Sequence, residues 1–279
     1  MIRYARQPDR GRTPPLVIAH RGASLAAPEN TLPAFELAIA AGASMIETDA
    51  QITADDQVVL VHDADLRRTT GRAGRIGSMD AARVRSYDAG FTFKLPGDES
   101  FAYRGRGVVV PTLGELIDLL DAHPAILLNL ELKTQDAGHR SRRTRDLAGA
   151  AVTELRDRGM LDRTLVSSFA PEALKWARAT EPEVATALLV NRYTDFDGVC
   201  AIAAAAGYAA IHPNDVYFGD GEAARRSVDA AHRRGLRVNV WTVDDEERMR
   251  ALIDAGVNGI ITNDPARLRQ MIVGARLRS

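Results

Sequence analysis

The stretch LVIAHRGASLAAPENTLPAFELAIAAGASMIETDAQITADDQVVLVHD, from Leu16 to Asp63, decides the fold of this chain. A helical pattern separates its first short apolar run from its second. Each of its three apolar runs ends on titratable groups, which are His20, then Glu47 and Asp49, then His62 and Asp63. Because parallel α/β folds carry their chemistry at the C-terminal ends of their strands, we expect these side chains to meet.

The same alternation of apolar runs and helical patterns continues to the end of the chain. The runs are Leu16–His20, Met45–Asp49, Ile126–Lys133, Leu165–Phe169, Ala185–Val190, Ala209–Pro213, Arg237–Thr242 and Gly259–Thr262. The helical patterns cover about 31–41, 112–122, 142–158, 171–179, 198–206, 221–234, 245–255 and 264–273. Such alternation implies parallel strands joined by right-handed crossovers. Eight such units favour an α/β fold of the (β/α)8 TIM barrel type, one domain over residues 16–275.

Local signals support these helix boundaries. Asn30 or Thr31 can cap the first helix, with Pro33 in its first turn and Gly42 after its end. Four later helices are expected to end at glycines, which are Gly159, Gly207, Gly235 and Gly256.

One segment interrupts the rhythm between His62 and Pro111. It is rich in Gly, Arg and Asp, and loops of this length are uncommon and usually functional. Because it follows the second strand region, we predict that residues 64–110 form a cap-like insertion over the mouth of the barrel. A tolerated surface insertion is the alternative.

Composition excludes several function classes. The net charge of −1 provides no field to attract nucleic acid or an anionic membrane. The one cysteine, Cys200, excludes an intrachain disulfide and a Cys-based metal site, so a packed core position is expected. Residues 1–15 carry arginines but no apolar stretch, which indicates a flexible tail rather than a secretory signal. Without an 18-residue apolar span, we expect a cytoplasmic protein with no stable membrane association.

Alternation within the strands sorts the polar residues onto one face. Glu47 and Asp49 share a face in the second run. In the third run, Asn129, Glu131 and Lys133 share one face, and the opposite face is a leucine stripe suited to the helix layer. The polar set is therefore expected inside the barrel, near its top.

Three carboxylates, Glu47, Asp49 and Glu131, are expected to converge from adjacent strands. Buried charges are costly unless they are compensated. Hard oxygen ligands clustered in this way suit a divalent cation, Ca²⁺ or Mg²⁺. The alternative is that Arg21 and Lys133 neutralise the carboxylates without metal.

His20 and His62 are candidates for general acid and base catalysis. Imidazole titrates near neutral pH, and each such role typically contributes about 10²- to 10⁴-fold in rate. His123, His139 and His232 are interpreted as structural. His212, at the end of the sixth run, could belong either to the pocket or to the core.

The remaining candidates concern substrate binding. Arg21 and Lys133 would favour an anion that gains charge during reaction, as in phosphoryl transfer. No Walker-type loop or Gly-rich dinucleotide turn occurs, which argues against nucleotide chemistry. Trp241 could form an apolar wall of the pocket or simply fill the barrel.

Taken together, the ordered motifs resemble those of the glycerophosphodiester phosphodiesterases. They are His20-Arg21-Gly22, Pro28-Glu29-Asn30-Thr31, Glu47-Thr48-Asp49, His62-Asp63, Asn129-Leu130-Glu131-Leu132-Lys133, Ser167-Ser168-Phe169 and Val240-Trp241-Thr242-Val243. The resemblance covers about Leu16 to Pro265. It departs from the family pattern at Asn263, where an acidic residue is expected after Thr262.

The resemblance implies a TIM barrel with an insertion after the second strand. It also implies hydrolysis of a small-molecule glycerophosphodiester to an alcohol and sn-glycerol 3-phosphate, assisted by a divalent cation. Carried over by position, the metal ligands are Glu47, Asp49 and Glu131, the acid/base pair is His20 and His62, and the substrate-binding residues are Arg21, Lys133 and Trp241. The Pro-Glu-Asn-Thr segment is expected to cap the first helix.

Three alternatives use the same residues differently. A lysophospholipase D-like hydrolase would combine the metal site with a more apolar pocket. A related barrel would only cyclise its substrate. A noncatalytic ligand-binding barrel comes from a different class, but it has no need for two histidines beside three metal ligands. A monomer and a homodimer are both compatible with the sequence.

Overall fold

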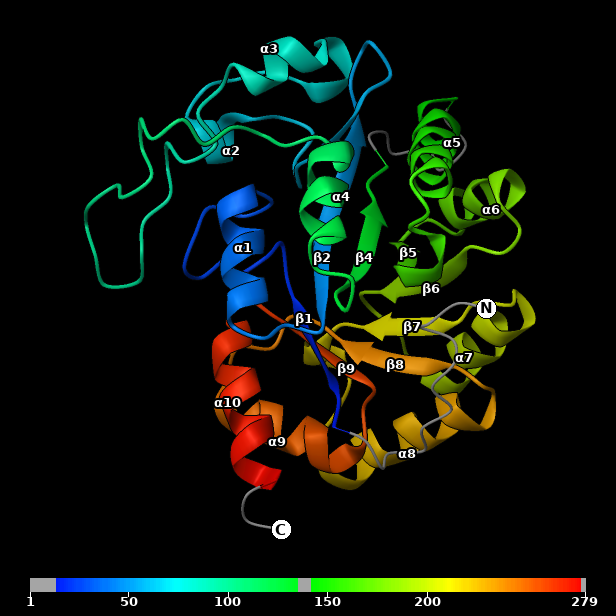
Figure 1. Cartoon of the computed structure of the whole chain (residues 1–279). Coiled ribbons are helices and arrows are strands. Elements are labelled where there is room, and N and C mark those ends of the chain that lie inside the picture. Colours follow the sequence, from blue (N-terminus) through cyan, green and yellow to red (C-terminus); the bar gives the residue numbers. More distant parts are fainter. Residues whose placement is uncertain (1–13, 135–141, 277–279) are drawn as a thin grey trace.

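Eight parallel strands close into a barrel with helices between them, as the alternating pattern predicted. The computed structural model describes residues 14–134 and 142–276. The barrel strands are β1 (Leu16–Ala19), β2 (Met45–Ile52), β4 (Leu127–Leu132), β5 (Thr164–Ser168), β6 (Ala185–Val190), β7 (Ala210–Pro213), β8 (Arg237–Val240) and β9 (Gly259–Thr262). Pairing of β1 with both β9 and β2 closes the ring. The fold is therefore a TIM barrel (Figure 1).

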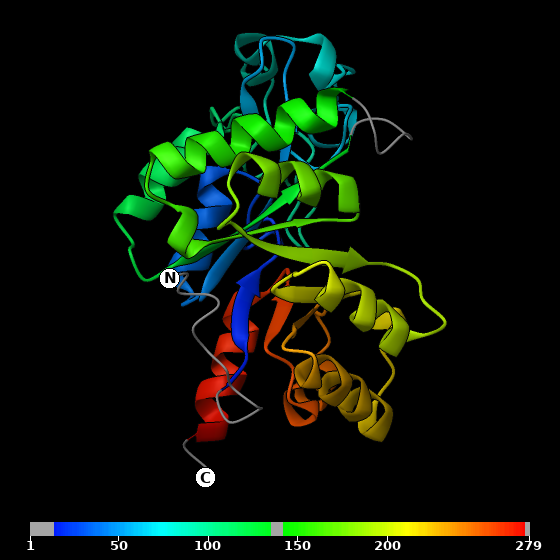
Figure 2. The same cartoon turned by 90° about the vertical axis from the view of Figure 1, so that its right-hand side faces the viewer.

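Helices surround the strands on the outside (Figures 1 and 2). They are α1 (Leu32–Ala40), α4 (Leu113–Asp121), α5 (Arg142–Asp157), α6 (Pro171–Thr180), α7 (Phe196–Ala205), α8 (Gly221–Arg233), α9 (Glu246–Ala255) and α10 (Pro265–Arg276). Short 3-10 turns are η2 (Leu161–Arg163) and η3 (Asp215–Tyr217). The predicted leucine stripe of β4, which includes Leu128 and Leu130, is buried in the core between strands and helices. Its burial contributes on the order of 2 kcal/mol per leucine.

The interior of the barrel has a separate apolar floor. Ile18, Met45, Leu165 and Ile261 are buried together there. Glu47 and Asp49 share the face of Met45 along β2, so they stand above this floor. The strand alternation therefore places the polar side chains over an apolar base.

The start of α1 differs from the prediction. Thr31 is the N-cap residue, but its hydroxyl donates to the Pro28 carbonyl and makes no capping hydrogen bond. Asn30 lies before the helix and bonds to β2 instead. The expectation was right for the position of the N-cap, Thr31, and wrong for side-chain capping, because Thr31 bonds to Pro28 and Asn30 bonds to Thr48 and Asp49.

A ninth strand, β3 (Val58–Leu60), runs antiparallel to the end of β2. Ala50 pairs with Leu60, and the Val61 amide donates to the Asp49 carbonyl at 2.8 Å. The hairpin thus leads the chain back toward the level of Asp49, where His62 follows. His62 reaches the polar end of the barrel through an antiparallel return and not as the end of a parallel strand.

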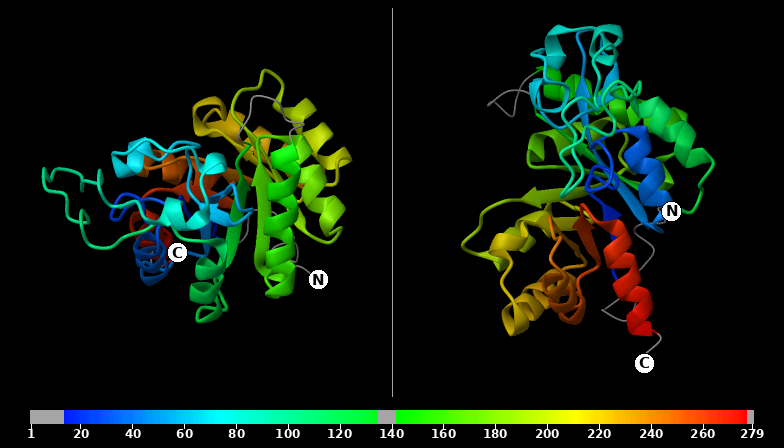
Figure 3. Two further views of the ribbon diagram at one scale, coloured as in Figure 1. Left: turned by 90° about the horizontal axis from the view of Figure 1, so that it is seen from above. Right: turned by 90° about the vertical axis from the view of Figure 1, so that its left-hand side faces the viewer.

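Between β3 and α4 the chain forms α2 (Arg67–Thr70), η1 (Ile76–Ser78) and α3 (Ala81–Arg85). These elements share a small hydrophobic core of their own, which includes Leu66, Ile76 and Val84. In Figure 1 they lie above α1 and α4, and Figure 3 shows the segment after α3 extending away from the barrel.

Cys200 is a free, buried thiol, as expected of a core residue. Within the described residues, no helix combines the length and the apolar character needed to cross a lipid bilayer.

Candidate active site

The sequence-predicted residues gather around one small cavity of about 50 Å³ inside the barrel. Its lining comes from seven of the barrel strands or their ends and from the segment after β3: His20, Arg21, Glu47, His62, Asn129, Glu131, Lys133, Ser167, Phe169, Leu189, Trp241 and Ile261. Asp49 does not line the cavity, but it is buried within the same cluster as Glu47 and Glu131.

The three carboxylates converge because β2 and β4 are neighbours in parallel register. Asp49 lies opposite Glu131, and Glu47 lies opposite Asn129. One oxygen from each of the three carboxylates lies within 4.8 Å of the others. All three side chains are buried. The pairing of β2 with β4 therefore brings the three carboxyl groups together inside the barrel, as the strand alternation predicted.

The environment of this cluster opposes full ionisation. Burial, followed by the charge of Asp49, raises the pKa of Glu131 to about 7 and that of Glu47 well above its usual value. Burial acts in the same direction on Asp49, but Lys133 and Arg21 hold the pKa of Asp49 at about 2. The cluster therefore retains an electrostatic cost at neutral pH that a bound cation would remove.

Two cationic side chains neutralise part of the cluster. Lys133 Nζ lies 2.7 Å from Glu131 Oε1 and 3.5 Å from Asp49 Oδ1. Arg21 Nε lies 3.2 Å from Asp49 Oδ2. Two cations do not balance three ionised carboxylates, so without a metal the cluster must bind a proton, in line with the raised pKa values of Glu47 and Glu131.

Buried oxygens without a hydrogen bond in the same place also fit a divalent ion. Asn129 Oδ1 and Asp49 Oδ1 accept no hydrogen bond among the described residues, and the charge of Lys133, 3.5 Å away, is the ion-pair partner of Asp49 Oδ1. Carboxylate and amide oxygens are the donors that Ca²⁺ and Mg²⁺ prefer. The residues present are therefore suited to holding a hard divalent cation.

The turn after β1 brings Arg21 into the cavity. Arg21 has φ of 56° and Gly22 has φ of 82°. A Cβ on Gly22 would lie 2.7 Å from the backbone of Ala34 in α1, so glycine permits this close approach. The Arg21 amide donates to Glu47 Oε2 at 2.8 Å, which links the turn to the acidic cluster.

His20 is oriented by Asn263, the position that departs from the family pattern. His20 Nδ1 and Asn263 Oδ1 are 2.7 Å apart, and Asn263 Nδ2 donates to Asp244 Oδ2 at 2.6 Å. An amide therefore stands between the imidazole and the carboxylate. Burial, together with the charge of Arg21, lowers the pKa of His20 to about 4.

His62 is oriented by a carboxylate directly. Its Nδ1 lies 2.6 Å from Asp63 Oδ1, so the ring presents Nε2 to its other side. Burial lowers the pKa of His62, although Asp49 acts in the opposite direction. Both predicted histidines line the same cavity and are held through Nδ1.

Sequence reasoning missed three residues that support the site, which are Glu29, Asn30 and Arg68, and it placed Asp63 at the site without giving it a role. Asn30 Nδ2 donates to Asp49 Oδ2 at 2.8 Å, and its Oδ1 accepts from Thr48. Glu29 accepts from Arg21 Nη1 at 2.9 Å. The signal for Glu29 and Asn30 was present in the Pro-Glu-Asn-Thr motif, but it was assigned to helix capping.

Trp241 lies in the wall of the cavity, and its ring packs edge to face against Phe169, with 5.4 Å between the ring centroids. Its Nε1 donates to the His212 carbonyl at 2.8 Å. The His212 side chain is fully buried, bonds to Asn239, and does not line the cavity. His212 therefore belongs to the core rather than to the pocket.

His123 and His232 do not line this cavity. His232 Nε2 bonds to Asn258 at 2.7 Å, and His123 lies between α4 and β4. His139 lies outside the described residues.

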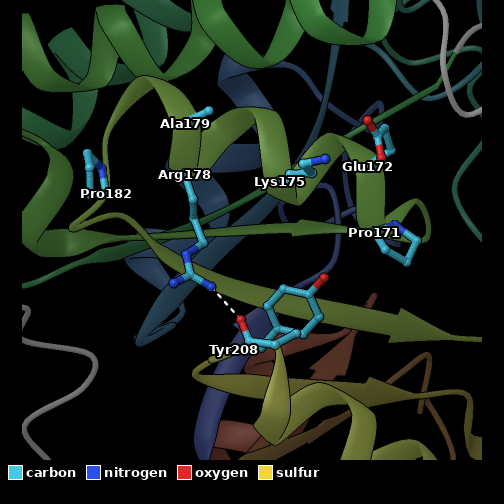
Figure 4. Close-up of a pocket in the computed structure, with 8 residues that line it drawn as sticks. Pro171, Glu172, Lys175, Arg178, Ala179, Pro182 and Tyr208 are labelled. Carbon is cyan, nitrogen blue, oxygen red and sulfur yellow. Dashed lines mark hydrogen bonds between the residues drawn. The ribbon is translucent and has the colours of Figure 1, made fainter.

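A larger groove of about 490 Å³ occurs on the outer surface beside α6 (Figure 4). It is lined by Glu172, Lys175, Arg178 and Tyr208 among others, and Arg178 donates to the Ala206 carbonyl. None of the predicted site residues line this groove. Size alone therefore does not identify the site; the convergence of acids, bases and cations does.

Known proteins are similar to this chain in both sequence and fold. Residues 20–267 match the Glycerophosphoryl diester phosphodiesterase family. A glycerophosphodiester phosphodiesterase of Caldanaerobacter subterraneus subsp. tengcongensis is 31% identical over 92% of this chain and 97% of the relative.

Two solved structures extend the likeness to three dimensions. A putative glycerophosphoryl diester phosphodiesterase from Silicibacter pomeroyi has a TM-score of 0.82 and 29% identity, and the match covers 95% of each chain. An Oleispira antarctica phosphodiesterase, solved with its product sn-glycerol-3-phosphate, has a TM-score of 0.78 and 28% identity, and the match covers 94% of this chain and 97% of that one.

Proposed function

This chain belongs to the glycerophosphoryl diester phosphodiesterase family and is a phosphoric diester hydrolase; from that premise we propose that it hydrolyses glycerophosphodiesters to an alcohol and sn-glycerol 3-phosphate, with a divalent cation and two histidines. One observation carries the proposal. Two buried carboxylates, two histidines and two cationic side chains line one cavity inside the barrel, and a third buried carboxylate, Asp49, lies beside the other two. A binding scaffold needs no such combination.

Glu47, Asp49 and Glu131 would hold the cation, either Ca²⁺ or Mg²⁺. When bound, it supplies Lewis-acid stabilisation of charge on a phosphoryl oxygen. Arg21 and Lys133 border the same cavity and stabilise the charge that develops on the phosphorus oxygens. Asn30 keeps Asp49 in its orientation.

His20 and His62 divide the proton transfers. One imidazole removes the proton of the attacking oxygen, and the other protonates the leaving alcohol. The Nδ1 contacts to Asn263 and Asp63 leave Nε2 of each ring for this work. Both roles require the rings on the same cavity, which is their arrangement.

Two attacking groups are compatible with this arrangement. The glycerol 2-hydroxyl can attack the phosphorus to form a cyclic phosphate that water then opens, with the advantage of an intramolecular reaction. Water can also attack directly. Hydrolysis in ¹⁸O-labelled water, with trapping of any cyclic product, distinguishes these routes.

A lysophospholipase D-like activity is the second candidate. It is favoured by Phe169, which is 39% exposed and packs against Trp241 at the cavity. An apolar surface there would suit an acyl chain.

We also propose that residues 16–275 act as one barrel domain, with residues 64–110 as a cap at the mouth. A cytoplasmic location and a monomeric or homodimeric state stay predictions from the sequence. Light scattering after size-exclusion chromatography checks the oligomeric state.

The proposal is tested by the release of glycerol 3-phosphate from glycerophosphocholine, measured through a coupled dehydrogenase. We expect turnover with Ca²⁺ or Mg²⁺ present, and its loss in EDTA, because the Lewis acid that stabilises charge on the phosphoryl oxygen is then absent. Release of acyl glycerol phosphate from a lysophospholipid alone would favour the second candidate. No hydrolysis of any glycerophosphodiester with metal restored would contradict the proposal.

A further inference from the structure

Arg68 on α2 contacts two acidic residues from different parts of the site. Its Nη1 and Nη2 each lie 2.6 Å from an oxygen of Glu29, in a bidentate pair. Its Nε lies 2.5 Å from Asp63 Oδ2. One planar guanidinium therefore joins the segment after β1 to the segment after β3.

Asp63 and Glu29, the two partners of Arg68, each make a further hydrogen bond to a residue of the cavity wall. Asp63 uses Oδ1 for His62 Nδ1, at 2.6 Å. Glu29 accepts from Arg21 Nη1 at 2.9 Å through Oε1, an oxygen it also offers to Arg68. Arg68 touches neither His62 nor Arg21, but it fixes the partner of each.

The backbone of Arg68 is itself held by the segment between β3 and α4. Leu66, two residues earlier, is buried in the small core of that segment. The Thr92 hydroxyl donates to the Arg68 carbonyl at 2.8 Å. The position of the guanidinium therefore depends on the packing of the inserted segment.

We propose that Arg68 is a positioning residue, through which the inserted segment orients both His62 and Arg21 by way of Asp63 and Glu29. The inference rests on the proposed function, because it assigns work to those two residues. It gives residues 64–110 a part in turnover that is separate from covering the mouth.

Because Arg68 is partly exposed, a positioning role and a purely structural role predict different effects on stability and activity. Its side chain is 47% exposed, and ion pairs at that exposure contribute little to folding. Loss of a partner that orients a functional group, in contrast, commonly costs about 10- to 100-fold in activity, by analogy with groups behind metal ligands. A positioning role therefore predicts a large kinetic effect with a small change in stability.

The primary test compares Arg68→Gln with Arg67→Gln on glycerophosphocholine. Arg67 is the adjacent, exposed arginine of the same short helix, so it is a matched control. We expect kcat/KM of R68Q to fall about 10- to 100-fold, R67Q to stay within about twofold, and both to melt within a few degrees of the unchanged chain. R68K, which keeps the charge but not the bidentate geometry, should lie between R68Q and the unchanged chain.

The two contacts can be separated by a split between kcat and KM. Asp63→Asn should lower kcat with little change in KM, since it affects proton transfer, whereas Glu29→Gln should lower kcat and also raise KM, because Arg21 binds the phosphate in both the substrate and the transition state. The kcat loss caused by R68Q should shrink in a D63N background, because the two residues act in one chain of contacts.

The outcomes distinguish the two proposals. If the unchanged chain hydrolyses no glycerophosphodiester, the proposed function fails. If it is active and R68Q stays within about twofold, or R67Q falls as far as R68Q, the inference about Arg68 is overturned. Full additivity of R68Q and D63N in kcat would equally overturn it.

Discussion

Two groups of buried polar side chains occupy opposite sides of the same barrel. On β2 and β4, the acids Glu47, Asp49 and Glu131 crowd within 4.8 Å and outnumber the cations beside them. On β7 and β8, His212 and Asn239 form a neutral pair at 2.9 Å. Both groups are hidden from solvent, but only the first brings several ionisable groups of like charge together.

The pKa shifts of the two groups distinguish a structural polar pair from a candidate functional cluster. Burial lowers the pKa of His212 to about 3, so the ring stays neutral at pH 7. Burying a neutral ring costs far less free energy than burying a charge. Burial raises the pKa of Glu131 to about 7, so near neutral pH a proton and a metal cation compete for this carboxylate. A site that keeps such a cost is a candidate for function.

The largest expected effect concerns the histidines of the cavity. His20→Ala and His62→Ala should each lower kcat by at least about 10²-fold, because each removes one proton-transfer group. Steady-state kinetics on glycerophosphocholine measures this effect. His212→Gln is the matched control on the opposite side and should stay within a few-fold. Near-normal turnover of either alanine variant would remove the role assigned to that histidine.

A smaller effect concerns stability against acid. The folded chain keeps His212 neutral down to about pH 3, whereas the unfolded chain protonates it near pH 6.5. Stability from this group is therefore present above pH 6.5 and lost as pH falls toward 3, at up to roughly 1.4 kcal/mol per pH unit.

Urea unfolding at pH 7 and pH 5 checks this difference. The unchanged chain should lose roughly 2 kcal/mol more than H212Q between these two pH values. Parallel losses in the two proteins would mean that His212 is not held neutral by burial.

Much of the site could be predicted because strand alternation is a local property. The leucines of β4 point to the helices, so Asn129, Glu131 and Lys133 must point inward. Parallel pairing with β2 then brings Glu131 opposite Asp49 without any further information. The barrel followed in the same way from eight alternating units.

Other features depend on contacts that a linear pattern does not contain. The run at Val58–Leu60 gave no sign that it would return antiparallel to β2. Asn30 satisfies a capping pattern equally well, and only tertiary packing against Asp49 decides its role. Arg68 is one of many basic residues in an arginine-rich chain, so its two partners could not be read from the sequence.

We propose that three buried carboxylates share one hard cation, and calorimetric titration of EDTA-treated protein with Ca²⁺ and Mg²⁺ measures this binding. We expect one ion per chain, and Glu131→Gln should weaken its affinity by at least about tenfold, because one charged ligand is lost. Glu172→Gln, in the outer groove, is the control and should bind as the unchanged chain does. Binding of no ion by a chain that turns over fully in EDTA would contradict the account.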